Sequence, residues 1–438
     1  MKQLLSILFW SIIAAAFIGP GTVTTAASAG AAHGHALLWA LGFSVVATLV
    51  LMEAATRLTI VSGRNLAEAI RERFSRGPSG ILVLLLVLGA IVVGNAAYEA
   101  GNILGAVAGV QLGFALPSAT VTLVIGAIAG ALLWAGTPRT VAHVLSITVG
   151  AMGVAFLVTA VGLRPDPAAI AGGLLVPSSP PGSALLILAL VGTTVVPYNL
   201  FLGSGLAEGH RLREVRFGLA VAVLLGGLVS MGVLVVGTAV EGPFTFEGLG
   251  EALSLRLGPW AGVLLAIGLF AAGFSSATTA PLAAAVTARG LFEDGSGRWS
   301  DGAWRYRAVW GGILLVGVAF GVAGVRPIPA IILAQALNGV LLPFAAVFLL
   351  IAVNDGRLMR GSALNGPLSN GLMILVTAVT VVLGGAGVLR AAFTTAGAGT
   401  PDEALVLGAG ILVCLLLAWP VTRELLRRRG LLPDPADP

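Results

Sequence analysis

Charge and cysteine are scarce in this sequence. Only 10% of the 438 residues are charged, whereas soluble domains carry about 25%, so an ordinary soluble fold is excluded. Cys414 is the single cysteine, which rules out a disulfide within the chain. Neither a Walker-type phosphate loop nor a Ser/His/Asp or metal-hydrolase spacing occurs, so we expect no enzyme, no nucleotide-driven pump and no cofactor. The chain has instead 57% hydrophobic residues and 61 glycines, the composition of a polytopic protein of the lipid bilayer.

Long apolar runs predict about twelve transmembrane helices, each near the ~20 residues that cross a bilayer. The predicted fold class is therefore an all-α polytopic membrane protein. The candidate spans are residues 3–33, 37–60, 80–110, 116–135, 142–163, 184–207, 217–240, 260–288, 308–325, 329–352, 371–389 and 404–421. The longest polar loops, at about 164–183, 241–258 and 289–307, are too short to form a domain. We expect a single transmembrane domain over 1–430 and a flexible tail over 431–438.

The basic residues predict the orientation in the membrane, because cytoplasmic loops are enriched in Lys and Arg. With a cytoplasmic N-terminus, 20 of the 24 basic residues fall inside, and only Arg164, Arg256, Arg326 and Arg390 fall outside. Both termini are therefore expected in the cytoplasm, with the chain in the inner (plasma) membrane. Basic loops beside anionic lipid also account for the net charge of +5 without a nucleic-acid partner.

Two of the spans are interrupted by helix-breaking residues at matching positions. Span 3–33 is broken at Gly19-Pro20-Gly21-Thr22, and span 184–207 is broken around Pro197. Non-helical backbone at membrane depth is tolerated only where it is buried in protein or lines a cavity. A matched pair of broken spans indicates the substrate site of a secondary transporter. The predicted substrate-binding residues are therefore Gly19, Pro20, Gly21, Thr22, Thr193, Val196, Pro197, Tyr198 and Asn199.

The breaks offer oxygen ligands. Interrupted helices leave backbone carbonyls and amides without partners, and the hydroxyls of Thr22, Thr193 and Tyr198 add further oxygens. Such ligands suit Na⁺, Mg²⁺ or a hydrogen-bonding organic solute better than a soft metal, so these three hydroxyls are the candidate metal ligands. The alternative is that glycine, proline and threonine only kink the helices, with the threonine hydroxyls bonded to carbonyls of their own turn.

The spacing of the two breaks indicates an inverted repeat. Pro20 and Pro197 lie 177 residues apart. That spacing suits two units of five spans, 1–163 and 184–352, with two extra helices over 371–421. Because five is an odd number, the second unit enters the membrane from the opposite side.

Several stretches resemble one family of transporters. Gly19-Pro20-Gly21-Thr22, Ala29-Gly30-Ala31 and Leu37-Leu38-Trp39 are similar to the first span of the Nramp (natural resistance-associated macrophage protein) divalent-metal transporters, which usually carry Asp-Pro-Gly-Asn at the break. The resemblance continues through 62–66, 192–202, 273–276, Gln335 and Pro343-Phe344, and covers roughly residues 5–360. It implies the LeuT-type 5+5 inverted-repeat fold, alternating access and, commonly, proton-coupled metal uptake.

The chain differs from this family in the site itself. Where the family's Asp, Asn, Met and His bind metal, this chain has Gly19, Thr22, Val196 and Tyr198. Loss of the thioether removes the ligand that favours soft transition metals, and loss of the carboxylate leaves a dehydrated divalent cation facing only dipoles. A hard ion that keeps its water, with Mg²⁺ as the leading candidate, tolerates such a site better than Mn²⁺ or Fe²⁺.

One carboxylate at membrane depth is a candidate for ion coupling. Glu99 has no basic neighbour in sequence, and an ionisable residue within a span is a functional hypothesis by default. The resemblance places Glu99 and Asn102 at two acidic positions of the family's proton route, so we predict proton or cation coupling there; a structural carboxylate is the alternative. Glu53 has Arg57 one turn later, which favours a structural ion pair. Gln335 is either a substrate ligand or an interhelical hydrogen-bonding group.

Three functions are compatible with these residues. We favour a secondary transporter of a divalent metal cation, which the resemblance and the oxygen-rich breaks support. The second is a LeuT-type carrier of a small organic or anionic solute, which the uncharged site supports. The third is a non-transporting sensor or scaffold, which the joint loss of several ligands supports. Nothing in the sequence predicts the oligomeric state.

Overall fold

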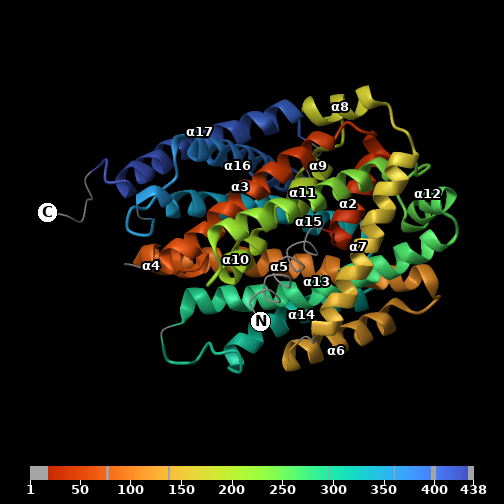
Figure 1. The fold of residues 1–438 in the computed structure, drawn as a ribbon, viewed down its shortest axis with the longest axis horizontal. Helices are drawn as coiled ribbons and strands as arrows, with labels where there is room; N and C mark the ends of the chain where they lie inside the picture. The colour runs from red at the N-terminus through yellow and green to blue at the C-terminus, as the bar shows by residue number, and fades with distance from the viewer. Residues whose placement is uncertain are drawn as a thin grey trace.

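The computed structural model describes residues 18–74, 78–136, 139–293, 295–359, 361–395 and 401–432. Within these ranges all the regular structure is helical, as predicted. The helices lie side by side, and most of them run roughly along the long axis of the molecule (Figure 1). Eleven helical segments of the described chain are long and apolar enough to cross a membrane. Helices satisfy their own backbone hydrogen bonds, which is what the interior of a bilayer demands.

The first half of the chain forms helices α2 to α7. Helix α2 (Pro20–His33) is the described half of the first predicted span, and residues 3–17 of that span lie outside the described ranges. The other spans are α3 (Leu38–Ser62), α5 (Pro78–Gly113), α6 (Ser118–Ala135) and α7 (Arg139–Gly162). A short helix, α4 (Leu66–Phe74), follows α3. It begins with a capping box, in which Asn65 and Glu68 exchange two hydrogen bonds of 3.0 Å.

The second half begins with a span in two pieces, α9 (Ala184–Thr194) and α10 (Pro197–Leu206). The remaining spans are α11 (Leu212–Gly237), α13 (Trp260–Phe292), α14 (Trp304–Val322), α15 (Pro327–Ala352), α16 (Pro367–Thr395) and α17 (Glu403–Arg428), with a 3₁₀ turn η1 (Gly361–Ala363) between α15 and α16. The predicted spans agree with these helices to within several residues at each end. Helices α16 and α17 are the two predicted extra helices, and both are longer than expected.

Two of the predicted polar loops contain a short helix. Helix α8 (Pro167–Leu175) begins at Asp166, whose carboxylate accepts a hydrogen bond from the Ala168 amide at 3.0 Å. Helix α12 (Phe246–Leu257) begins at Thr245, whose hydroxyl accepts from the Gly248 amide, also at 3.0 Å. Both starts are ordinary N-caps. They lie near the same end of the molecule in Figure 1.

Glycines allow the central helices to touch at their backbones. A Cβ on Gly192 of α9 would overlap the carbonyl oxygen of Gln335 and lie 2.5 Å from the amide nitrogen of Gly339, both in α15. A Cβ on Gly30 of α2 would overlap the carbonyl oxygen of Leu234 in α11. Small residues at such crossings are the usual means by which helices approach closely in a membrane. The two broken spans are thus held against α11 and α15 with almost no side chain between them.

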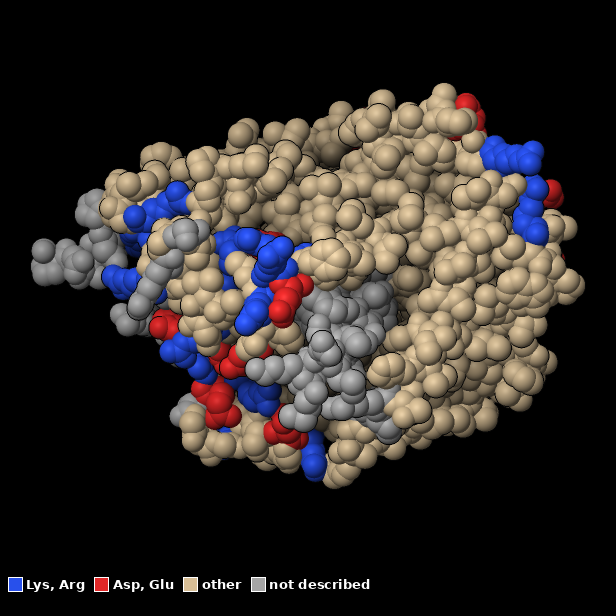
Figure 2. Space-filling model, viewed as in Figure 1, with Lys and Arg blue, Asp and Glu red and all other residues tan. Residues whose placement is uncertain are grey.

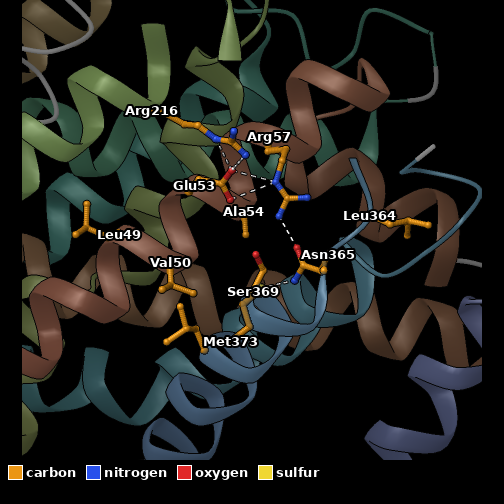
Figure 3. A pocket seen from close by; sticks show the side chains of 12 residues that line it. Leu49, Val50, Glu53, Ala54, Arg57, Arg216, Leu364, Asn365, Ser369 and Met373 are labelled. Carbon is orange, nitrogen blue, oxygen red and sulfur yellow. Dashed lines mark hydrogen bonds and ion pairs between the residues drawn. The ribbon is translucent and has the colours of Figure 1, made fainter. Parts of the chain in front are cut away.

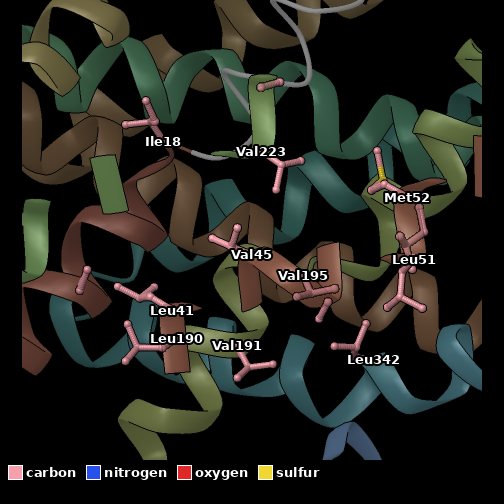
Figure 4. Close-up of a cluster of buried hydrophobic side chains, with 14 of the residues drawn as sticks. Ile18, Leu41, Val45, Leu51, Met52, Leu190, Val191, Val195, Val223 and Leu342 are labelled. Atoms are coloured by element: carbon pink, nitrogen blue, oxygen red, sulfur yellow. The ribbon is translucent and has the colours of Figure 1, made fainter. Parts of the chain in front are cut away.

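Around these crossings, apolar side chains from four helices fill the core. Leu51 of α3, Leu190 of α9, Val223 of α11 and Leu342 of α15 are all fully buried. They belong to one contiguous cluster, part of which Figure 4 shows around the broken sixth span. The core therefore surrounds the interruption rather than lying to one side of it.

The charged residues visible in Figure 2 gather mainly toward the end of the molecule where α4 and the end of α17 lie. A smaller group is visible at the opposite end, near α8 and α12. Between them, almost all the described residues visible in this view are uncharged. This distribution matches a molecule that crosses a bilayer along its long axis.

The ion pair predicted between Glu53 and Arg57 is confirmed. The Arg57 Nε lies 3.1 Å from a carboxylate oxygen of Glu53, and Arg216 of α11 approaches the same oxygen at 2.6 Å. Arg57 also donates to Asn365 at 2.5 Å and to the Ala363 carbonyl. The side chains of Glu53, Arg57, Arg216 and Asn365 line a cavity of about 420 Å³ between α3, α11 and the start of α16 (Figure 3). The cluster ties α3 to α11 and to the connection before α16.

Candidate functional site

The sixth span is interrupted where the sequence predicts it. Helix α9 ends at Thr194, and α10 starts at Pro197 after Val196 in an extended conformation (φ −79°, ψ 124°). Pro197 has no amide hydrogen and cannot continue a helix, yet its fixed φ suits the first position of a new one. The backbone therefore leaves the helical path for two residues, Val195 and Val196.

Helix α2 begins at the other predicted break. Gly19 is extended (φ −90°, ψ 171°), and α2 begins at Pro20, again with proline at the first helical position. The carbonyl of Gly19 accepts the first backbone hydrogen bond of the helix, from Val23 at 3.1 Å. Pro20 packs against α5, because a Cβ on Gly105 would overlap its ring. The earlier half of this span, within 3–17, lies outside the described residues.

The start of α2 and the end of α9 lie in direct contact. The hydroxyl oxygens of Thr22 and Thr193 are 3.1 Å apart, and both side chains are buried. Gln335 of α15 reaches the same place: a Cβ on Gly21 would overlap its amide and lie 3.1 Å from the Thr193 hydroxyl. Three predicted substrate ligands from α2, α9 and α15 thus converge on Gly21. Two of these side chains carry a hydroxyl, and the third carries a carboxamide.

The alternative interpretation holds for two neighbouring threonines. The Thr25 hydroxyl donates to the Gly21 carbonyl at 2.8 Å, and the Thr194 hydroxyl donates to the Leu190 carbonyl at 3.0 Å. Both hydroxyls bond within their own helix, as threonines that only bend a helix do. Thr22 and Thr193 differ, since their hydroxyls meet each other across the two breaks.

Beside Gly19 lies a group of three hydroxyls, of which the sequence predicts only one as part of the site. Tyr98 of α5 and Tyr198 of α10 pack edge to face, with ring centroids 5.3 Å apart and an interplanar angle of 62°. The Tyr98 hydroxyl interacts with the hydroxyls of both Tyr198 and Ser276 of α13. Only Tyr198 among these was predicted. Tyr98 directly precedes Glu99, and Ser276 lies in a stretch that resembles the Nramp family, but neither position carries a spacing signal.

Val196 belongs to the same cluster, where it is buried with Tyr98 and Tyr198 against Ala280 and Ala283 of α13. Asn199 is only half-buried, and its backbone amide closes the first turn of α10 by donating to the Val196 carbonyl at 3.0 Å. The predicted residues of the sixth span therefore face two different surroundings. Thr193 faces the first break, and Val196 and Tyr198 face the tyrosine cluster.

Glu99 is fully buried but faces a different helix. A Cβ on Gly317 of α14 would lie 2.8 Å from the Cγ of Glu99. The Asn102 side-chain amide donates to one carboxylate oxygen at 3.3 Å, whereas the other oxygen has no hydrogen-bond partner within the described chain. The predicted pair of Glu99 and Asn102 is thus brought together, one helical turn apart on α5. An incompletely satisfied carboxylate in a protein interior is costly and calls for a functional explanation.

Other buried polar atoms near the breaks also lack partners within the described chain. They include the side-chain oxygen of Gln335, the amide nitrogen of Asn338 and both polar atoms of Asn95. Buried amides of this kind are normally satisfied by ordered water or a bound ligand. The region between α5 and α15 is therefore polar enough to accommodate a hydrated species.

The residues described here contain no group of three or more His, Cys, Asp or Glu that could hold a metal ion. The groups at the break itself are hydroxyls, a carboxamide and backbone. This arrangement offers hard, neutral oxygen ligands and no fixed charge.

The start of α2 lies against the break between α9 and α10, which is the arrangement of the LeuT-type fold, and two solved structures share this fold. A manganese transporter of Eremococcus coleocola aligns with a TM-score of 0.73 and 17% identity, covering 98% of this chain and 96% of that chain. Mhp1, a nucleobase-cation-symport-1 family transporter, aligns with a TM-score of 0.57 and 16% identity, covering 98% and 94% of the two chains.

The sequence identifies the family within this class. The profile of the Nramp family, described as natural resistance-associated macrophage protein-like, matches residues 11–390. A divalent metal cation transporter, MntH of Deinococcus radiodurans, is 31% identical over 373 residues, which are 80% of this chain and 82% of that relative. The chain therefore belongs to the Nramp family, whose members are transporters and not enzymes.

Proposed function

We propose that this chain is a secondary transporter of a divalent metal cation, and that it favours a hard, partly hydrated ion such as Mg²⁺ over Mn²⁺ or Fe²⁺. Family membership and the D. radiodurans relative support the cargo class. The observation that carries the preference is the contact of Thr22 with Thr193, beside Gln335, at the meeting point of the two breaks. These neutral oxygen donors suit a hard cation whose own water screens its charge.

Transport would proceed by alternating access around these breaks. Half-helices that end at membrane depth let one part of the molecule rock against the rest, with the bound ion at the pivot. Glu99 and Asn102 are the candidate groups for proton or cation coupling, because Glu99 is fully buried and only partly satisfied. The charged end of the molecule would face the cytoplasm of a cell whose plasma membrane holds the chain, with both chain termini on that side.

The test is ion flux into liposomes that contain the purified protein. Mg²⁺, Mn²⁺, Ca²⁺ and amino acids are offered separately, with and without a pH gradient. We expect divalent-ion uptake, with Mg²⁺ carried better than Mn²⁺. Flux of amino acids without any divalent ion would contradict the proposal and support the organic-solute alternative, which the uncharged break and its two tyrosines favour.

A paired variant tests the contact itself. Replacing both threonines (Thr22→Val and Thr193→Val) keeps their shape and removes both hydroxyls. We expect at least about a tenfold loss of apparent affinity, the ~1.4 kcal/mol that corresponds to a hydrogen-bonding group lost from a site. Thr287→Val is the control, since Thr287 is equally buried but its hydroxyl bonds within α13, to the Ala283 carbonyl at 2.8 Å. Equal uptake by the double variant and the control would contradict the role of the two hydroxyls.

A further inference from the structure

The space beside Gly19 is occupied by a hydroxyl from another helix. An ideal Cβ on Gly19 would lie 3.3 Å from the Tyr98 hydroxyl oxygen and 3.8 Å from that of Ser276. The extended backbone of Gly19 (φ −90°, ψ 171°) is open to any residue. The conformation of the chain therefore does not require glycine here. The Tyr98 hydroxyl is what crowds a side chain at this position.

Tyr98 is held in this position by close packing. Its side chain is 1% exposed, and its ring meets that of Tyr198 edge to face. Ala280 and Ala283 of α13 complete the buried surroundings. Close-packed interiors resist a change of side-chain volume, so the ring cannot swing aside at little cost. A carboxylate at residue 19 would have to compete with the hydroxyl for the same space.

Tyrosine is rare in this chain, yet it is concentrated beside Gly19. The chain contains three tyrosines, and two of them meet beside Gly19. The third, Tyr306, is buried near the start of α14, where it packs beneath Arg289. Tyr306 therefore provides a matched control for the removal of one buried tyrosine hydroxyl.

We propose that Tyr98 is a specificity-determining residue, whose hydroxyl, with Ser276 and Tyr198 beside it, replaces a side chain at position 19 and keeps the site neutral. The proposal rests on the proposed function, since it concerns which divalent ions the site accepts. A neutral hydroxyl cannot compensate a dehydrated divalent charge as a carboxylate does. It can hydrogen-bond to the water that a hard ion retains. The site would thus select ions by their reluctance to lose water.

The experiment reinstates the carboxylate with and without the hydroxyl. Gly19→Asp, Tyr98→Phe and the double variant are compared with the parent for Mn²⁺ and Mg²⁺ binding by calorimetry and for uptake into liposomes. We expect Gly19→Asp alone to bind both ions poorly, because the carboxylate and the Tyr98 hydroxyl collide. In the double variant we expect Mn²⁺ binding at least tenfold tighter than in Gly19→Asp, and a Mn²⁺ to Mg²⁺ preference shifted at least tenfold from the parent.

The controls separate this role from a general loss of packing. Gly19→Asp combined with Tyr306→Phe should behave as Gly19→Asp alone. If Gly19→Asp fails to fold, Gly19→Ala serves instead, since it adds only the crowded Cβ. Tyr98→Phe should then restore the thermal stability that Gly19→Ala loses, and Tyr306→Phe should not.

Two different failures are distinguishable. Equal Mn²⁺ binding by Gly19→Asp and by the double variant would overturn the role of Tyr98, whichever ion the parent protein transports. Absence of any divalent-ion flux in the parent would instead contradict the proposed function. The binding measurements still decide whether the hydroxyl and the new carboxylate compete for one space.

Discussion

Glu99 and Tyr98 are neighbours in the chain but face different surroundings. Tyr98 faces the tyrosine cluster, whereas Glu99 packs against Gly317 of α14. The carboxylate accepts a hydrogen bond from Asn102 and none from the hydroxyls beside Gly19 within the described chain, so a role in coupling fits it better than one as a direct ligand. Its single amide partner, Asn102, leaves one carboxylate oxygen available to bind a proton or a cation.

We expect Glu99→Gln to remove the pH dependence of uptake while metal binding persists. Glutamine keeps the shape of the side chain but cannot take up or release a proton. The measurement is Mg²⁺ uptake into liposomes across a series of external pH values, with Glu251→Gln on the exposed surface of α12 as the control. A Glu99→Gln protein whose uptake still responds to a pH gradient like the parent would refute coupling at this residue.

At the residue scale, the sequence predicts the members of the site that lie in the breaks and misses those that come from unbroken helices. Thr22 and Thr193 are found because proline and glycine interrupt the chain beside them. Tyr98 and Ser276 lie inside regular helices, α5 and α13, and only the packing of those helices brings them to Gly19. Gln335 was found through its polarity in an apolar span. No local pattern states which of several buried polar groups share one site.

At the scale of helices, Gly192 has the most demanding contact of the broken sixth span. We expect Gly192→Ala to destabilise the protein, because its Cβ would overlap the Gln335 carbonyl of α15 and force α9 outward. Overpacking of this kind costs about 1–3 kcal/mol. The measurement is the thermal unfolding midpoint in detergent, together with Mg²⁺ uptake.

Gly150→Ala in α7 is the matched control, since Gly150 is exposed and a Cβ there meets nothing within 4 Å. Alanine in place of an exposed helical glycine is expected to raise stability by roughly 0.5–1 kcal/mol. If Gly192→Ala proved as stable as Gly150→Ala, the close approach of α9 and α15 would not be required.

Hydropathy predicts the long helices well because each must be apolar throughout to cross a bilayer. Hydropathy does not predict α8 and α12, which lie in polar connections. The sequence nonetheless contains an N-cap residue at the start of each helix, in Asp166-Pro167 and at Thr245. The capping box of Asn65 and Glu68 marks α4 in the same way. Local capping signals, and not apolar length, would have found these three helices.

At the scale of the whole molecule, the two charged ends make the orientation testable. We expect a membrane-impermeant maleimide added to intact cells to label Glu241→Cys, in the connection before α12, and not Ser300→Cys, between α13 and α14. Both positions are exposed, and both variants are made in a Cys414→Ser background, since Cys414 is the single native cysteine. Labelling of Ser300→Cys should appear once the membrane is permeabilised. The reverse pattern would show that the chain is inserted the other way.

The neutrality of the break has an electrical consequence. Under the proposed function, the groups at the break add no charge to the empty carrier, whereas the bound ion adds two positive charges there. The membrane voltage acts on these two added charges, with about 2.3 kcal/mol per charge for each 100 mV. Two charges correspond to roughly 4.6 kcal/mol, enough for an approximately thousandfold accumulation inside a polarised cell. Replacing a fixed carboxylate by hydroxyls would thus make the resting potential itself a sufficient driving force.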